Sequence, residues 1–207
     1  MGLLTGFTAG LLLITLSELG DKTFFIAAIL AMRHPRRWVF AGAATALFAM
    51  TVLSVLLGQV AAAFPQRYVQ GVAAALFIGF GLKLLYDALK MSGAKGLMGE
   101  QADAQNAVEQ KEKNVILWSA RAVVVEAFTL TFIGEWGDRT QLATITLAAA
   151  NNPYGVLLGA TLGHAICAAI AVICGKLIAG RISERLLTGV GGALFLVFGA
   201  ITLLEMP

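Results

Sequence analysis

The stretch that decides the fold is SELGDKT at residues 17–23, which returns as GEWGDRT at residues 134–140. Each copy places two acidic residues and one basic residue within a long apolar run. A carboxylate at the centre of a bilayer costs several kcal/mol, so such groups are rare in membrane spans and usually mark functional sites. The repeated charged motif therefore indicates a site to which both parts of the chain contribute.

The composition is that of an integral membrane protein. Of the 207 residues, 58% are hydrophobic and 13% are charged, and the mean hydropathy is +0.82. A soluble domain of this size needs far more polar surface. The small excess of Lys and Arg is typical of membrane topology, and we expect no nucleic-acid partner. Cys167 and Cys174 share one apolar run, which argues against a disulfide framework.

Six apolar runs reach or approach the roughly 20 residues that a helix needs to cross the hydrocarbon core. They cover residues 3–31, 38–64, 68–89, 115–150, 154–179 and 186–204. We therefore predict an all-α membrane protein with six transmembrane helices. The first and fourth runs are longer than a span requires and contain the glycine-bearing motif, so each of these helices should be bent or broken at E-x-G-D.

The two parts of the chain are related by an internal duplication. An offset of 117 superimposes the two motifs and also pairs Gly42 with Gly159 and Gly58 with Gly175. The predicted division is a first three-helix repeat at 1–90, a cytoplasmic linker at 91–114 and a second three-helix repeat at 115–207. The linker is rich in glycine and charge, so we expect it to be solvated.

Three spans per repeat is an odd number, so the second repeat should enter the membrane from the opposite side. Inverted repeats of this kind form binding sites near the midplane, at the repeat interface. Cytoplasmic loops carry an excess of Lys and Arg. One side of the predicted topology holds most of these residues and the other holds only Arg67. This pattern predicts a cytoplasmic linker, with both termini outside, and a bacterial inner (plasma) membrane location.

The two acids of each motif are three residues apart and would share one face of a helix. An inverted repeat can bring both pairs together, and nearby hydroxyl and amide groups add oxygen atoms. Ca²⁺, Mn²⁺ and Mg²⁺ prefer such ligands, whereas zinc sites recruit more His or Cys. The predicted metal ligands are Glu18, Asp21, Glu135 and Asp138, with Ser17, Thr23, Thr140 and Gln141 as weaker candidates.

Lys22 and Arg139 each follow their glutamate by four residues, the favoured order for a helical ion pair. We expect them to act as charge partners of the acids or as a gate. Four acids and two bases leave a formal charge of −2, which one divalent cation or two protons would neutralise. The motifs thus predict metal/proton exchange, with Asp21 and Asp138 as the least compensated ligands. The metal would be a transported substrate, and no permanently bound cofactor is expected.

The pattern E-φ-G-D-[KR]-[TS], at residues 18–23 and again at 135–140, resembles that of the Gdt-type family of small membrane cation/proton exchangers. This family includes MneA-like manganese exporters in bacteria and Golgi calcium/manganese exchangers in eukaryotes. Both copies match at every defined position, and the resemblance covers nearly the whole chain outside the linker. It implies export of Mn²⁺, with Ca²⁺ as the competing substrate, through the four motif carboxylates.

Other functions are compatible with acidic residues in a membrane. An intramembrane aspartyl protease also pairs carboxylates, but it would carry one Asp in each of two dissimilar motifs. An exporter of small organic cations or amino acids would need a larger cavity than this Gly- and Ala-rich chain indicates. A passive channel is a further alternative, since sequence does not reveal alternating access. The sequence leaves the oligomeric state open between monomer and homodimer.

Polar residues outside the motifs have simpler explanations. His164 and Cys167 share a face of the fifth run with Cys174, where ordinary buried side chains and a softer second metal site are both compatible with the spacing. Glu126 precedes the second motif by nine residues. It is expected to be an interfacial partner of Arg121 near the cytoplasmic end of its span, or else a proton relay.

Overall fold

The computed structural model describes residues 2–90, 96–112, 119–178, 184–204 and 206. The described residues form nine helices and no strands, which confirms the all-α prediction. The helices are α1 (Leu3–Glu18), α2 (Lys22–Arg33), α3 (Arg36–Ala61), α4 (Gln66–Lys90), α5 (Gly96–Glu112), α6 (Ala120–Glu135), α7 (Arg139–Ala150), α8 (Pro153–Ile178) and α9 (Glu184–Leu204).

Both motif copies break their helix in the same way. α1 and α6 each end at the motif glutamate, and α2 and α7 each begin directly after the motif aspartate. Gly20 and Gly137 have φ angles of 84° and 81°, in the left-handed region that suits glycine. A backbone hydrogen bond closes each turn, from Asp21 N to the Glu18 oxygen at 3.2 Å and from Asp138 N to the Glu135 oxygen at 3.1 Å. The expected breaks at E-x-G-D are therefore present.

Within the described ranges, three helices are long and apolar enough to cross a membrane: α3, α4 and residues 153–174 of α8. The pair α1–α2, bent by 64°, passes the same test as one broken span. Four of the six predicted spans are thus recognisable from length and composition among the described residues. In the fourth run, α6 and α7 carry Arg121 and Glu126 besides the second motif's charges. In the sixth run, the apolar part of α9 is only residues 188–204.

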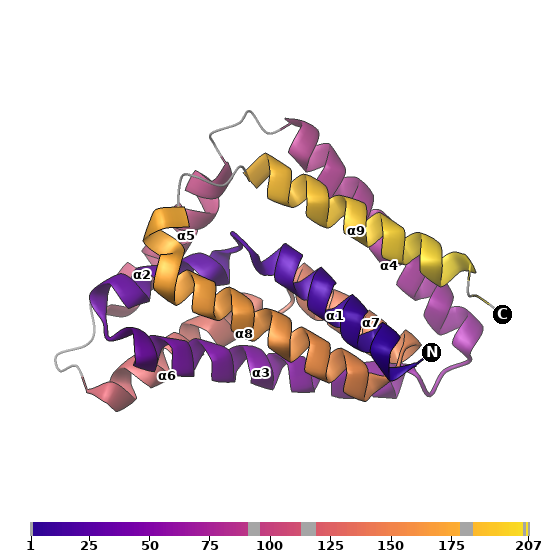
Figure 1. Cartoon of the computed structure of the whole chain (residues 1–207), viewed down its shortest axis with the longest axis horizontal. Helices are drawn as coiled ribbons and strands as arrows, with labels where there is room; N and C mark the ends of the chain where they lie inside the picture. The colour runs from indigo at the N-terminus through magenta and orange to yellow at the C-terminus, as the bar shows by residue number, and fades with distance from the viewer. Residues whose placement is uncertain (1, 91–95, 113–118, 179–183, 205, 207) are drawn as a thin grey trace.

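Each broken helix packs against a long helix from the other half of the chain. α1 and α2 contact α8, and α6 and α7 contact α3, while α4 and α9 lie side by side (Figure 1). A Cβ atom built on Gly42 would overlap the carbonyl oxygen of Val124, and one built on Gly159 would overlap that of Phe7. These two contacts are related by the same offset of 117 as the motifs. Glycine lets the helix backbones approach closely at both places.

The segment between the halves was expected to be solvated, and most of its described side chains are exposed or partly exposed, but it is a helix with one buried side. Residues 96–112 form α5, which packs on α2, and the Ala104 and Val108 side chains are fully buried there. Arg33 of α2 lies 3.8 Å from Glu109 of α5. The four-residue spacing of Ala104 and Val108 is the helical signal that the charged composition concealed. The predicted linker ends, at 91 and 114, lie outside the described residues.

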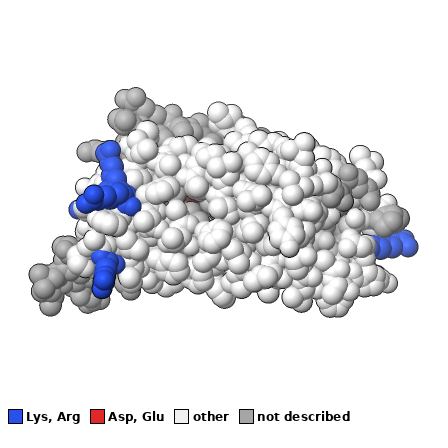
Figure 2. All heavy atoms as spheres, turned by 60° about the horizontal axis from the view of Figure 1, so that its bottom comes forward, with Lys and Arg blue, Asp and Glu red and all other residues white. Residues whose placement is uncertain are grey.

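On the face of the molecule drawn in Figure 2, basic residues gather at the two ends. Figure 2 shows a larger basic group at one end and a smaller one at the other, with a face between them that carries almost no charge. The larger group lies at the end that holds the turn between α2 and α3, and both chain termini lie at the opposite end (Figure 1). An uncharged band between charged ends is the surface expected of a membrane-spanning protein.

Candidate metal centre

Three carboxylates from the two halves meet at the helix breaks. One ligand oxygen each from Glu18, Asp21 and Glu135 lies within 4.8 Å of the other two. Two oxygens on opposite sides of one Ca²⁺ ion are about 4.6–5.2 Å apart, because each lies 2.3–2.6 Å from the ion. One divalent ion can therefore contact all three side chains, with only small adjustments. Glu18 and Glu135 are both 2% exposed, which places the cluster inside the protein.

Each motif glutamate has one oxygen atom without a hydrogen-bond partner in the described part of the chain. Glu18 Oε1 and Glu135 Oε1 are buried, and neither has a hydrogen-bond partner among the described residues; the same is true of Ser17 Oγ. Most buried polar atoms in folded proteins are paired, so each exception calls for an explanation. A bound cation would explain these atoms, because it would be coordinated by both carboxylates at once.

The motif threonines hold the other oxygen of each glutamate. Thr23 Oγ1 donates to Glu18 Oε2 at 3.4 Å, and Thr140 Oγ1 lies 3.3 Å from Glu135 Oε2. Both threonines are buried, at 3% and 2% exposure. Hydrogen bonds of this kind orient a ligating carboxylate. Thr23 and Thr140 thus have the geometry of supports for the glutamates.

The basic residues are not arranged as helical spacing predicted. Arg139 Nη2 lies 3.1 Å from Asp21 Oδ1, so it pairs across the two halves instead of with Glu135. The helix breaks between Glu135 and Arg139, which removes the geometry that a four-residue helical pair requires. Lys22 makes no ion pair with any described residue.

Asp138 and Gln141 stabilise the second break. Asp138 Oδ2 accepts hydrogen bonds from Thr140 N at 3.2 Å and from Thr140 Oγ1 at 3.0 Å, which makes it the N-cap of α7. Gln141 Oε1 accepts from Gly137 N at 2.7 Å. Asp138 lies outside the group of three carboxylates whose oxygens lie within 4.8 Å of one another, although the sequence predicted it as an equal ligand.

Two further polar side chains lie beside Glu18, and two others that the sequence singled out are buried. Thr131 and Cys167 line, with Glu18, a cavity of about 10 Å³. Sequence reasoning missed Thr131, although it lies one helical turn before Glu135. His164 is 6% exposed, and its Nδ1 atom has no partner among the described residues. Glu126 on α6 is 4% exposed, so its side chain is buried within the protein.

These observations define a class of protein. Carboxylate oxygens from two halves of a helical membrane protein converge at paired helix breaks, and two of them are buried with no hydrogen-bond partner among the described residues. Discontinuous helices that meet at buried charged groups are typical of secondary ion transporters.

Comparison with known proteins assigns the family. The family model described as "Divalent cation/proton antiporter GDT1" matches residues 6–92 and 123–207, one motif in each segment. A GDT1-like protein from Synechocystis, sll0615, is 56% identical over 201 residues, covering 97% of both chains. GDT1-like protein 5 from Arabidopsis thaliana is 42% identical, covering 98% of this chain and 96% of its own. No solved structure matches.

The chain belongs to the GDT1 family of divalent cation/proton antiporters. It is therefore a transporter and not an enzyme, which excludes the intramembrane protease that paired carboxylates also allowed. The names of these relatives do not specify which divalent cation they carry.

Proposed function

We propose that this protein exports a divalent cation, with Mn²⁺ as the principal cargo and Ca²⁺ as a competitor, in exchange for protons. The observation that carries the proposal is the convergence of Glu18, Asp21 and Glu135 at the two helix breaks. The four motif acids and the two motif bases sum to −2, which suits one divalent ion or two protons in alternation. Asp138 completes this charge balance from the N-terminus of α7.

Carboxylate oxygens suit both Mn²⁺ and Ca²⁺. We take Mn²⁺ as the principal cargo because the two E-φ-G-D-[KR]-[TS] motifs resemble those of MneA-like manganese exporters. Ca²⁺ remains the competitor, because the three carboxylates that converge at the helix breaks suit it as well.

The space beside the glutamates favours a bare ion over an organic cargo. The cavity next to Glu18 measures about 10 Å³. A cavity needs roughly 10–15 Å³ to hold one water molecule, so an amino acid or organic cation would not fit there. This argues against the exporter of organic cations that the sequence left open.

We propose six spans, namely α1–α2, α3, α4, α6–α7, α8 and α9, arranged as two inverted three-helix repeats. The support is the pairing of each broken helix with the long helix of the other half, and the matched contacts at Gly42 and Gly159. The larger basic group lies at one end (Figure 2), and the positive-inside rule makes that end cytoplasmic. The termini would then face the outside of a bacterial plasma membrane.

The test is flux through the purified protein in proteoliposomes, with Mn²⁺, Ca²⁺ or Mg²⁺ outside and an imposed pH gradient. We expect Mn²⁺ uptake to accelerate when the lumen is acidic and to slow when an ionophore collapses the gradient. The uptake of each Mn²⁺ ion into the lumen should be accompanied by the movement of protons out of it. Metal flux that ignores the pH gradient would contradict proton coupling, and a Ca²⁺ rate well above that of Mn²⁺ would contradict the proposed cargo.

The matched control is a carboxylate away from the centre. Asp103 is exposed on α5, so Asp103→Asn removes one acid without touching the cluster. Flux in this variant should equal that of the wild type, whereas Glu18→Gln should abolish it. Equal flux in both variants would remove Glu18 from the proposed pathway.

A further inference from the structure

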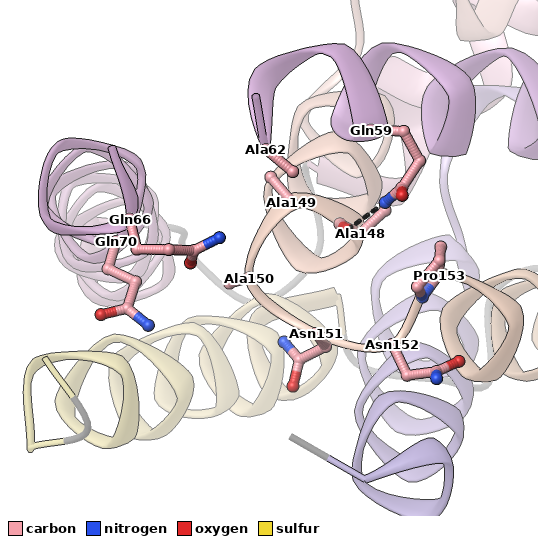
Figure 3. A pocket seen from close by; sticks show the side chains of 10 residues that line it. All are labelled: Gln59, Ala62, Gln66, Gln70, Ala148, Ala149, Ala150, Asn151, Asn152 and Pro153. Carbon is pink, nitrogen blue, oxygen red and sulfur yellow. Dashed lines mark hydrogen bonds between the residues drawn. The ribbon is translucent and has the colours of Figure 1, made fainter. Parts of the chain in front are cut away.

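A second polar region lies far from the carboxylates, at the end of the molecule that holds the termini. It is a cavity of about 670 Å³ between α3, α4 and the turn from α7 to α8 (Figure 3). Asn152 of this turn lies against Gly6 near the start of α1, which fixes the cavity at the end where the chain begins. None of the residues that line it is charged. Five of them carry side-chain amides: Gln59, Gln66, Gln70, Asn151 and Asn152.

Two hydrogen bonds fix amide side chains beside the cavity through their nitrogen atoms. Gln59 Nε2 donates to the Ala148 oxygen at 2.9 Å, and Asn151 Nδ2 donates to the Leu147 oxygen at 3.2 Å. Each of these two side chains thus donates from its NH₂ group to a backbone oxygen of α7, and its amide oxygen can bind another group. Gln70 Oε1 is buried, and Asn152 Oδ1 accepts a hydrogen bond from Gly155 N at 3.1 Å, so the oxygens that remain for a ligand are those of Gln59, Gln66 and Asn151. Neutral oxygens of this kind can replace part of the water shell of a cation.

The helix that ends at this cavity begins at the carboxylate centre. α7 starts at Arg139, directly after the second motif, and ends at Ala150, whose neighbours line the cavity. Twelve residues of helix span about 18 Å at 1.5 Å per residue. The C-terminal end of a helix carries a partial negative charge that attracts cations. α7 therefore presents that end to the cavity and its opposite end to the metal centre.

The corresponding place in the first half is covered. The offset of 117 relates the C-terminal end of α7 to that of α2, and α5 packs on α2 there. Ala104 and Val108 are buried in this contact, and Arg33 faces Glu109. The two halves thus differ: the end of α7 borders a cavity, while the end of α2 is packed against a helix.

We propose that the amide-lined cavity is a vestibule that binds the hydrated divalent cation weakly on its way between the carboxylate centre and the side of the membrane that holds the termini. This inference rests on the proposed function and names a second site on the same path. Neutral amide oxygens suit a weak binding site of this kind, because they bind a divalent ion less strongly than carboxylates do. The ion keeps much of its water there and loses it at the carboxylates.

The test changes the charge of the vestibule without touching the centre. Gln66→Glu and Gln70→Glu should lower the Mn²⁺ concentration that half-saturates uptake from this side, and Gln66→Lys should raise it. One unit charge at several ångströms from a divalent ion in a watery site changes its local concentration by about threefold to tenfold. The effect should shrink at high salt. Gln101→Glu and Gln101→Lys, on α5 at the opposite end, are the matched controls and should leave this concentration unchanged.

A labelling experiment reads the vestibule without transport. Gln66→Cys, in a background in which Cys167 and Cys174 are replaced by Ala, should react faster with a cationic thiol reagent than with an anionic one. Millimolar Mn²⁺ should slow the cationic reaction. Equal reaction rates with no effect of Mn²⁺, together with an unchanged half-saturating Mn²⁺ concentration in the Gln66 and Gln70 variants, would contradict the vestibule. If the wild type still transported Mn²⁺ in that case, the proposed function would stand. Absence of any divalent flux in the wild type would instead overturn the proposed function itself.

Discussion

The two motif copies share one backbone but differ in how their side chains are used. Gly20 and Gly137 adopt nearly the same φ, and both breaks are closed by the same backbone hydrogen bond. Asp138 caps α7 through Thr140, whereas Asp21 makes no capping hydrogen bond to α2 and instead meets Arg139 from the other half. The duplication therefore preserved the helix break, and the two aspartates took different tasks.

Neighbouring residues explain this divergence. Gln141 secures the backbone of the second break through Gly137, and its counterpart at offset 117 is Phe24, which cannot do so. Gly134 stands where the first copy has Ser17, and a Cβ there would come within 2.9 Å of Thr23 Cγ2. The second motif thus makes room for the threonine of the first. The centre is a joint product of two unequal halves.

The largest effect should come from the features that the two copies share. Glu18→Gln and Glu135→Gln each remove a buried ligand charge, and each should abolish Mn²⁺ flux. Loss of a residue that merely supports a metal ligand already costs about 10–100-fold in affinity, so the loss of a ligand charge should cost more. Proteoliposome flux measures both variants. A variant that retained half of the wild-type rate would show that one half works alone.

Substitution of the two motif aspartates should have unequal effects on Mn²⁺ binding. Asp21→Asn should raise the half-saturating Mn²⁺ concentration about 100-fold, and Asp138→Asn only about tenfold, because the first lies in the cluster and the second supports it. Asn is as good an N-cap as Asp, so the cap of α7 survives the second change. Mn²⁺ titration of the purified variants gives both values. Equal losses in the two variants would restore the symmetric four-carboxylate centre that the sequence predicted.

The two motif bases should also differ. Arg139→Gln frees Asp21 from its ion pair, so Mn²⁺ should bind several-fold more tightly, while transport slows because release is harder. Lys22→Gln is the matched control, since Lys22 makes no ion pair with a described residue, and it should change both quantities little. Binding and flux measured on the same preparations test this. A larger effect at Lys22 than at Arg139 would show that Lys22, and not Arg139, is the charge partner of the centre.

The smallest difference should be in stability. Gly20→Ala and Gly137→Ala force a side chain into the left-handed region, which costs about 1–2 kcal/mol at either site. The free energy of unfolding in detergent should fall by similar amounts. Gly79→Ala is the control, because nothing lies within 4 Å of its Cβ position and it lies inside α4, so this change should stabilise the protein slightly. Unequal losses at Gly20 and Gly137 would indicate that the two breaks carry different strain.

Much of this architecture was predictable from local sequence. Apolar runs gave the helical class, and the motif glycines gave the two breaks, because both depend on nearest neighbours along the chain. The convergence of Glu18 with Glu135 followed only from the duplication, since no local rule relates residues 117 positions apart. The matched contacts of Gly42 and Gly159 are the structural counterpart of that offset.

Other features depend on packing that sequence patterns do not encode. Arg139 was expected beside Glu135, and it pairs with Asp21 because the break redirects α7. Residues 96–112 were expected to be solvated on account of their charge, and only the burial of Ala104 and Val108 against α2 reveals why they form a helix there. In both cases the deciding contact is tertiary, with a residue far away in the chain or across a helix break.

The central claim is that carboxylates from both halves hold one ion together. The most direct measurement is the stoichiometry of Mn²⁺ bound to the purified protein, by equilibrium titration of the wild type, Glu18→Gln and Glu135→Gln. We predict one Mn²⁺ per wild-type chain at this affinity and none in either variant. Two Mn²⁺ ions in the wild type and one in each variant would mean that each half has its own site, and would contradict the account.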